Sequence, residues 1–223
     1  RARFLRPVRA GGSDHVNLIH VDLGDKTSSW LQWMMALEDY SHGSDVINDE
    51  AYWLTEQSDN TLLPVDRDGE NTVAQVESID IRLNEEDTTQ LLTQAGGAYR
   101  TEINDLLLTA LGMTLGPWAD ADTVLVDLEG HGREEISDTV DVSRTVGWFT
   151  SIFPVSLSVD PLTLDSLTLD PSTEKQSGLA KQIKQTKEYL HIVPKKGLSY
   201  GLLKYRSTDD QTRLKLRGNS IVC

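Results

Sequence analysis

Six consecutive residues, Glu129-Gly130-His131-Gly132-Arg133-Glu134, carry the side chains best suited to acid–base chemistry in this sequence. Two carboxylates, an imidazole and a guanidinium group so close along the chain could set one another's pKa values. The two glycines let the backbone turn sharply. The same residues also suit a structural turn, in which Arg133 pairs with a carboxylate and His131 is satisfied locally. Composition alone favours that structural interpretation, because ion-pair networks perturb pKa values as well.

Other chemistries have weaker support in the sequence. None of the five histidines pairs with another at a spacing of four residues, and Cys223 is the only cysteine, so we expect no metal site and no intrachain disulfide. A nucleophile elbow of the Gly-x-Ser-x-Gly type is absent, and the glycine pairs lack the spacing of a phosphate-binding loop. Acid–base chemistry is therefore the remaining candidate.

Two predicted elements would position the six-residue run. Residues 123–128 (TVLVDL) read as a core strand that leads directly into Glu129, and catalytic groups are common at such strand ends. Apolar residues cover most of the surface of a helix predicted over 101–115, which indicates a buried helix with Asn104 as a polar exception. Strands mixed with buried helices predict an α/β or α+β fold.

Further elements follow from periodicity and capping signals. Helices are predicted over 30–40, 51–56, 84–94 and 172–191, strands over 73–83 and 153–159, and loops over 58–71 and 162–170.

Charge is unevenly distributed along the chain. The 21 basic and 35 acidic side chains give a formal net charge of −14, and most of the acidic excess lies before residue 171, whereas the remainder is basic. An acidic body would repel a phosphate backbone, so nucleic acid is a poor partner. No stretch has the roughly 18 apolar residues of a membrane span, and the arginine-rich start lacks the apolar core of a secretory signal. We therefore expect a cytoplasmic protein that binds neither nucleic acid nor membrane.

Four stretches in order resemble successive motifs of nonribosomal peptide synthetase epimerization domains. They are YRTEINDLLLTAL at 99–111, EGHGRE at 129–134, DVSRTVGWFT at 141–150 with FPV at 153–155, and VPKKGLSYGLL at 193–203. This resemblance implies the chloramphenicol acetyltransferase-like fold of the condensation-domain superfamily, here its C-terminal subdomain with part of the preceding linker. Within it we expect a divergent segment at 1–27, a partial domain at 28–205 and a divergent tail at 206–223. We expect residues 1–25 and about 213–223 to be poorly packed.

The sequence also departs from the family pattern. The family's H-H-x-x-x-D motif is approximated only by His20-Val21-Asp22, so its active-site histidine has no counterpart here. Ser199 stands where glycine is usual in the fourth motif.

The resemblance implies a reaction and a set of residues. An epimerization domain inverts the Cα of an aminoacyl or peptidyl thioester on the phosphopantetheine arm of a carrier domain, so the arm comes from the partner and no cofactor is bound directly. Glu129 would be an acid–base group supported by Tyr200 and Asn104, whereas His131 and Trp148 would contact substrate. Carrier domain and adjacent synthetase modules would be the partners.

We expect this chain to be inactive alone. Two alternatives remain open: a fragment of a condensation domain, which forms peptide bonds, and a non-catalytic remnant that only docks a carrier.

Overall fold

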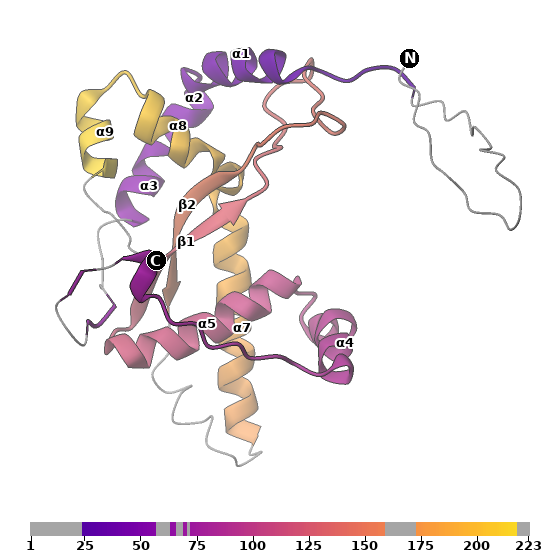
Figure 1. Cartoon of the computed structure of the whole chain (residues 1–223), viewed down its shortest axis with the longest axis vertical. Coiled ribbons are helices and arrows are strands. Elements are labelled where there is room, and N and C mark those ends of the chain that lie inside the picture. Colours follow the sequence, from indigo (N-terminus) through magenta and orange to yellow (C-terminus); the bar gives the residue numbers. More distant parts are fainter. Residues whose placement is uncertain (1–23, 57–62, 66–68, 71, 159–172, 218–223) are drawn as a thin grey trace, which may run out of the picture. The chain divides into compact units, whose positions relative to one another are not determined.

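The computed structural model describes residues 24–56, 63–65, 69–70, 72–158 and 173–217 (Figure 1). The chain divides into two compact units. One consists of Arg1–Leu37 and Glu135–Trp148, and the other of Glu38–Glu134 and Phe149–Cys223. The predicted division at residues 27 and 205 stays a prediction, and most of the N-terminal segment lies outside the described residues.

The first unit joins the chain before helix α1 (Trp30–Ser41) to the loop that follows the six-residue run. The Ser28 N–H donates to the carbonyl of Asp141 at 2.8 Å, and the Thr145 hydroxyl donates to the Ser28 carbonyl. Ser29 caps α1, because its hydroxyl accepts from the Gln32 N–H at 3.2 Å. The predicted helix and its cap are confirmed.

The second unit is built on two antiparallel strands, β1 (Thr123–Gly130) and β2 (Ser151–Ser158). Their register runs from the Thr123–Ser158 pair to the Gly130–Ser151 pair. Val124 and Val155 are fully buried, so the apolar character predicted for these strands is confirmed as core packing. A core strand over 123–128 would also be expected to lie in the centre of a sheet, but among the described residues β2 is the single partner of β1.

Helix α7 (Thr173–Ile192) contacts β2, and two of its side chains bond to the backbone of that strand. The Tyr189 hydroxyl accepts from the Ser156 N–H at 2.7 Å and donates to the Glu56 carboxylate at 2.6 Å. The Gln182 amide donates to the Ser158 carbonyl at 2.6 Å. Burial, followed by the bond to Glu56, raises the pKa of Tyr189. The predicted helix at 172–191 is therefore confirmed.

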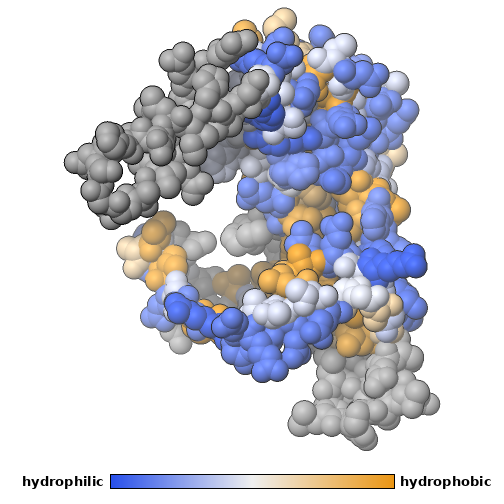
Figure 2. Space-filling view, turned by 90° about the vertical axis from the view of Figure 1, so that its right-hand side faces the viewer, coloured by the Kyte–Doolittle hydropathy of each residue, from blue (hydrophilic) through white to orange (hydrophobic). Residues whose placement is uncertain are grey.

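Helix α5 (Ile103–Ala119) begins with a capping box formed by Glu102 and Asp105. It packs against α7 and the strands and buries Leu108 and Met113. The prediction that α5 is buried all round is wrong, because Leu107 is 50% and Leu111 is 39% exposed. Large apolar side chains of other elements are exposed as well, and Figure 2 shows such apolar patches between hydrophilic residues on one face of the molecule. The sequence predicted the helix correctly, but no described element covers this side of it.

Four short helices form a second part of the core around Trp53. They are α2 (Ser44–Asn48), α3 (Glu50–Glu56), α8 (Leu198–Arg206) and α9 (Asp210–Arg217). Trp53 is fully buried, its ring centroid lies 5.2 Å from that of Tyr200, and its indole N–H donates to the Ser199 hydroxyl at 2.9 Å. Ser199, which stands where the family usually has glycine, therefore accepts the hydrogen bond of a buried tryptophan N–H.

The region after residue 206 is better packed than the sequence indicates. Thr212 and Leu216 of α9 are 1% and 0% exposed. Asp209 caps this helix, because its carboxylate accepts from the N–H groups of Gln211 and Thr212. The expectation of poor packing over about 213–223 is wrong for residues 213–217, where Leu216 is fully buried, while residues 1–23 and 218–223 lie outside the described part.

The segment between α3 and α5 follows the prediction in part. Helix α4 (Glu85–Thr93) is capped by Asn84 as predicted, and a 3₁₀ turn, η2 (Ala95–Ala98), follows it. The strand predicted over 73–83 is wrong: a 3₁₀ turn, η1 (Val73–Gln75), is followed by irregular chain, and Ile79 and Ile81 are 91% and 88% exposed. An alternating pattern forms a strand only where a partner edge is present.

Candidate active site

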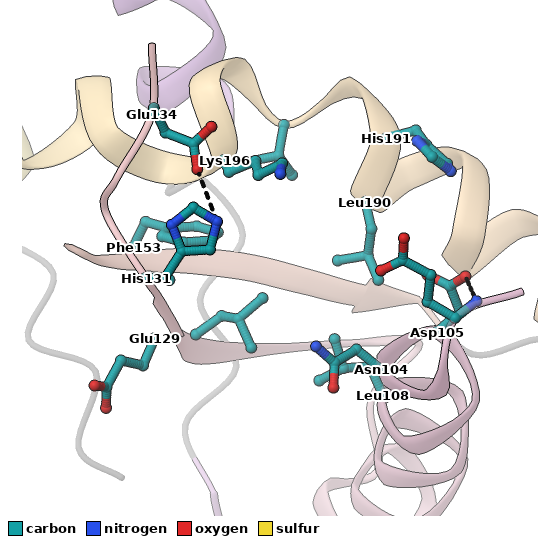
Figure 3. Close-up of a pocket in the computed structure, with 14 residues that line it drawn as sticks. Asn104, Asp105, Leu108, Glu129, His131, Glu134, Phe153, Leu190, His191 and Lys196 are labelled. Atoms are coloured by element: carbon teal, nitrogen blue, oxygen red, sulfur yellow. Dashed lines mark hydrogen bonds and ion pairs between the residues drawn. The ribbon is translucent and has the colours of Figure 1, made fainter. Parts of the chain in front are cut away.

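A pocket of about 320 Å³ lies where β1 ends, beside the first turn of α5 and the last turn of α7 (Figure 3). The 3₁₀ turn η3 (Pro194–Gly197) closes another side through Lys196. Its walls combine apolar side chains with polar ones. Leu108, Leu128, Phe153, Leu190 and Val193 supply the apolar surface, and Glu102, Asn104, Asp105, Glu129, His131, Glu134, His191 and Lys196 supply polar groups.

Two of the predicted catalytic residues meet at this pocket. Glu129 is the penultimate residue of β1, and Asn104 lies in the first turn of α5. Both side chains are exposed, and neither has a hydrogen bond or ion pair within the described part of the chain. The Glu129 carboxylate points away from Asn104 in Figure 3. Glu129 is thus an exposed residue at the rim of the pocket, with its carboxylate directed away from the other labelled lining residues.

The third predicted residue, Tyr200, has a different environment. It is 4% exposed, packs against Trp53 and accepts a hydrogen bond from the Lys204 ammonium at 3.3 Å. Tyr200 is not among the residues that line this pocket. The expectation that Tyr200 supports Glu129 together with Asn104 is therefore not met at this pocket, because α8 turns the Tyr200 ring into the core around Trp53.

His131 is held by the turn in which it lies. Its Nδ1 accepts from the Arg133 backbone N–H at 3.0 Å, and its Nε2 lies 3.4 Å from the Glu134 carboxylate (Figure 3). An Nδ1 that accepts assigns the ring proton to Nε2, which then donates to Glu134. His131 lines the pocket, but both ring nitrogens already have partners. Its assignment to substrate binding stays a prediction.

The remaining residues of the six-residue run support this turn. The Arg133 guanidinium lies over the Phe149 ring at 3.9 Å, which agrees with a scaffold role. Gly132 has a φ of 65°, and a Cβ at this position would overlap the Phe149 carbonyl. The turn therefore requires glycine.

Trp148, the other predicted substrate-binding residue, belongs to the first compact unit. Its side chain is 80% exposed and does not line the pocket. Its proposed contact with substrate stays a prediction.

Sequence reasoning missed two residues of the pocket, His191 and Lys196. In the sequence His191 marks only the end of a helix, and Lys196 is one of several surface lysines. A signal was present for Lys196, since Pro194 and Gly197 bracket it in a short turn between two helices.

Within the described residues, no group of three or more histidine, cysteine, aspartate or glutamate side chains is placed to hold a metal ion. None of the described helices is both long and apolar enough to cross a membrane.

The sequence profile of the family described as "Condensation domain" matches residues 20–222. The chain belongs to the condensation-domain family. The structure is similar to that of a solved epimerization domain, from the third module of tyrocidine synthetase B, with a TM-score of 0.70 and 36% sequence identity. The match covers 86% of this chain and 40% of the epimerization-domain chain. The predicted condensation-domain fold is thereby confirmed.

Large peptide synthases are also similar to this condensation-family chain in sequence. A linear gramicidin synthase protein of Brevibacillus parabrevis is 41% identical over 194 residues, which are 86% of this chain and 4% of that protein. A plipastatin synthase protein of Bacillus subtilis (strain 168) is 42% identical over 190 residues, 84% of this chain and 7% of that protein. The chain therefore corresponds to a small part of each large relative.

Proposed function

We propose that this chain is part of an epimerization domain that inverts the Cα of an aminoacyl or peptidyl thioester on a carrier domain. The observation that carries the proposal is the position of Glu129 at a strand end on the rim of an amino-acid-sized pocket, where its carboxylate pairs with none of the described residues. The E-G-H-G-R-E run and the similarity to a solved epimerization domain support epimerization over condensation.

The chemistry assigned to Glu129 is proton transfer at Cα. A thioester carbonyl acidifies the Cα proton, so a carboxylate within hydrogen-bond reach of that proton can remove it. Inversion then requires a proton to return to the opposite face of the planar enolate. Phosphopantetheine belongs to the substrate in this scheme, since the carrier domain brings it. Asn104, on the same pocket, can donate its amide N–H to a substrate oxygen.

We also propose that the chain is inactive alone. The second acid–base group would come from an H-H-x-x-x-D motif, and this sequence contains only His20-Val21-Asp22 in its place. Losing one positioned acid or base typically lowers a rate by about 10²–10⁴-fold. The same absence is what favours the second candidate, a non-catalytic segment that docks a carrier.

A chimera tests the proposal. The part of the tyrocidine synthetase epimerization domain that matches this chain is replaced by this chain, and exchange of the Cα proton for deuterium is followed on a carrier-bound aminoacyl thioester. We expect exchange by the chimera, a loss of about 100-fold or more in Glu129→Gln, and an unchanged rate in the neighbouring control Glu135→Gln. The chain alone should give no exchange.

Other outcomes contradict the proposal in different ways. Full exchange by the Glu129→Gln chimera removes Glu129 from the reaction. Peptide-bond formation without exchange favours a condensation domain. Binding of the carrier with neither reaction favours the docking segment, and exchange by the chain alone contradicts its inactivity.

A further inference from the structure

The turn that leads from α7 into α8 has an uncommon backbone. Lys195, Lys196 and Gly197 all have positive φ, at 44°, 46° and 83°. This left-handed conformation is unfavourable for a residue with a Cβ, and such residues concentrate at functional sites. Glycine is required at 197, because a Cβ there would overlap the ring of Phe153. Glycine would also fit positions 195 and 196 with less strain, yet both hold lysine.

The two lysines differ in what they face. Lys196 lines the pocket, whereas Lys195 does not. Lys195 acts electrostatically on Asp49: burial raises the pKa of that carboxyl, while its hydrogen bond with Ser199 and the Lys195 charge oppose the rise. The turn thus directs Lys196 to the pocket, and its neighbour serves as a natural comparison.

Most other charged groups of the pocket already have partners. Glu134 lies beside the His131 ring, and Glu102 and Asp105 form the capping box of α5. The remaining charged side chains are Glu129 and Lys196, and neither forms an ion pair in the part of the chain that the structure describes. Lys196 therefore carries the available positive charge of the lining.

The surface beneath this charge is apolar. Leu128, Phe153 and Leu190 line the same pocket as Lys196 (Figure 3). A hydrogen bond made next to apolar surface is stronger than one in bulk water. The volume of about 320 Å³ is at the small end of ligand pockets and suits a group of amino-acid size.

We propose that Lys196 is a substrate-binding residue, whose ammonium group donates a hydrogen bond to a carbonyl oxygen of the carrier-bound acyl group. The identity of this acyl group rests on the proposed function. Lys196 holds the carbonyl end at the turn, and the apolar wall receives the aliphatic part of the ligand.

Binding to the chain itself tests this assignment without requiring catalysis. The probe is leucyl-pantetheine amide, in which nitrogen replaces the thioester sulfur so that it is not hydrolysed. Its titration into the ¹⁵N-labelled chain is followed by NMR, together with the thermal midpoint of each variant. The variants are Lys196→Gly, Lys196→Arg and the matched control Lys195→Gly.

We expect Lys196→Gly to bind the probe about tenfold more weakly, as the loss of a charged hydrogen bond predicts. Lys195→Gly should bind like the original chain, and Lys196→Arg should keep most of the affinity because it keeps the charge. Both glycine variants should have raised thermal midpoints, because glycine relieves the left-handed strain. Weaker binding in a more stable protein cannot result from unfolding.

Three results would overturn the role of Lys196: no binding by the original chain, equal binding by Lys196→Gly, or an equal loss in Lys195→Gly. This test is separate from that of the proposed function. A tenfold loss in Lys196→Gly alongside full exchange by the Glu129→Gln chimera keeps the binding role and rejects the proton transfer.

Discussion

Gly197→Ala should destabilise the second unit strongly. Gly197 has a φ of 83°, and its missing side chain leaves the space that the Phe153 ring occupies. Phe153 is 3% exposed, and its ring centroid lies 6.1 Å from that of Trp53, so the ring has little room to move away.

Two effects contribute to the expected magnitude. A left-handed conformation costs about 1–2 kcal/mol for a residue with a Cβ. Forcing an extra methyl group into a packed core costs about 1–3 kcal/mol. The free energy of unfolding should therefore fall by about 2–5 kcal/mol, a large part of the roughly 5–15 kcal/mol typical of folded domains.

Urea unfolding followed by tryptophan fluorescence measures this change, because the fully buried Trp53 reports on the affected core. Gly201→Ala is the matched control. Gly201 lies within α8 and a Cβ there meets nothing within 4 Å, so alanine should stabilise the helix by about 0.5–1 kcal/mol. A Gly197→Ala variant that is as stable as the original chain would refute the packing described around Phe153.

Two further predictions concern hydrogen bonds. Tyr189→Phe should lower the free energy of unfolding by about 2–4 kcal/mol in urea, because it leaves the Ser156 N–H and the Glu56 carboxylate without their partner. Tyr205→Phe, at a position 61% exposed, should change it by less than about 0.5 kcal/mol, and similar effects of both would contradict the first. Asp209→Ala should destabilise α9, since hydrogen bonds from Thr212 and Gln211 lower the pKa of this carboxyl below its ordinary 3.8. Because the folded state lowers this pKa, the ionised carboxylate stabilises the fold above pH 3.8, and the stabilisation is lost as the pH falls through the folded-state pKa. The thermal midpoints of Asp209→Ala and of the original chain should therefore converge in acid. A difference that stays constant with pH would argue against the cap.

Local signals in the sequence predicted elements of both units. The caps at Ser29 and Asn84 marked two helix starts, and the β-branched run at 123–128 marked β1. Each of these features depends on residues close together in the chain, so its outcome does not require knowledge of the tertiary partners.

The errors have a common physical origin in long-range contacts. Ile79 and Ile81 alternate like strand residues but pair with no edge among the described strands. Leu107 is apolar but lies on a side of α5 that none of the described elements covers. Conversely, α9 was missed although Asp209 caps it, because the burial of its side chains depends on distant residues, such as Glu50, to which the Thr212 hydroxyl donates.

The site was predictable only as far as the motif extends. Glu129 and Asn104 meet at the pocket, since one follows β1 and the other begins α5. Tyr200 could not be separated from them by sequence, because the direction of its side chain depends on how α8 packs against Trp53.

The bonds between α7 and β2 determine on which side the sheet can grow. Ladder bonds alternate along a strand, so the Ser156 N–H and the Ser158 carbonyl point away from β1, where Tyr189 and Gln182 already bond to them. A strand that approached β2 from outside would first have to break both bonds. Any strand added to this sheet, from this chain or another, should therefore pair with β1, next to the backbone of Asp127 and Glu129.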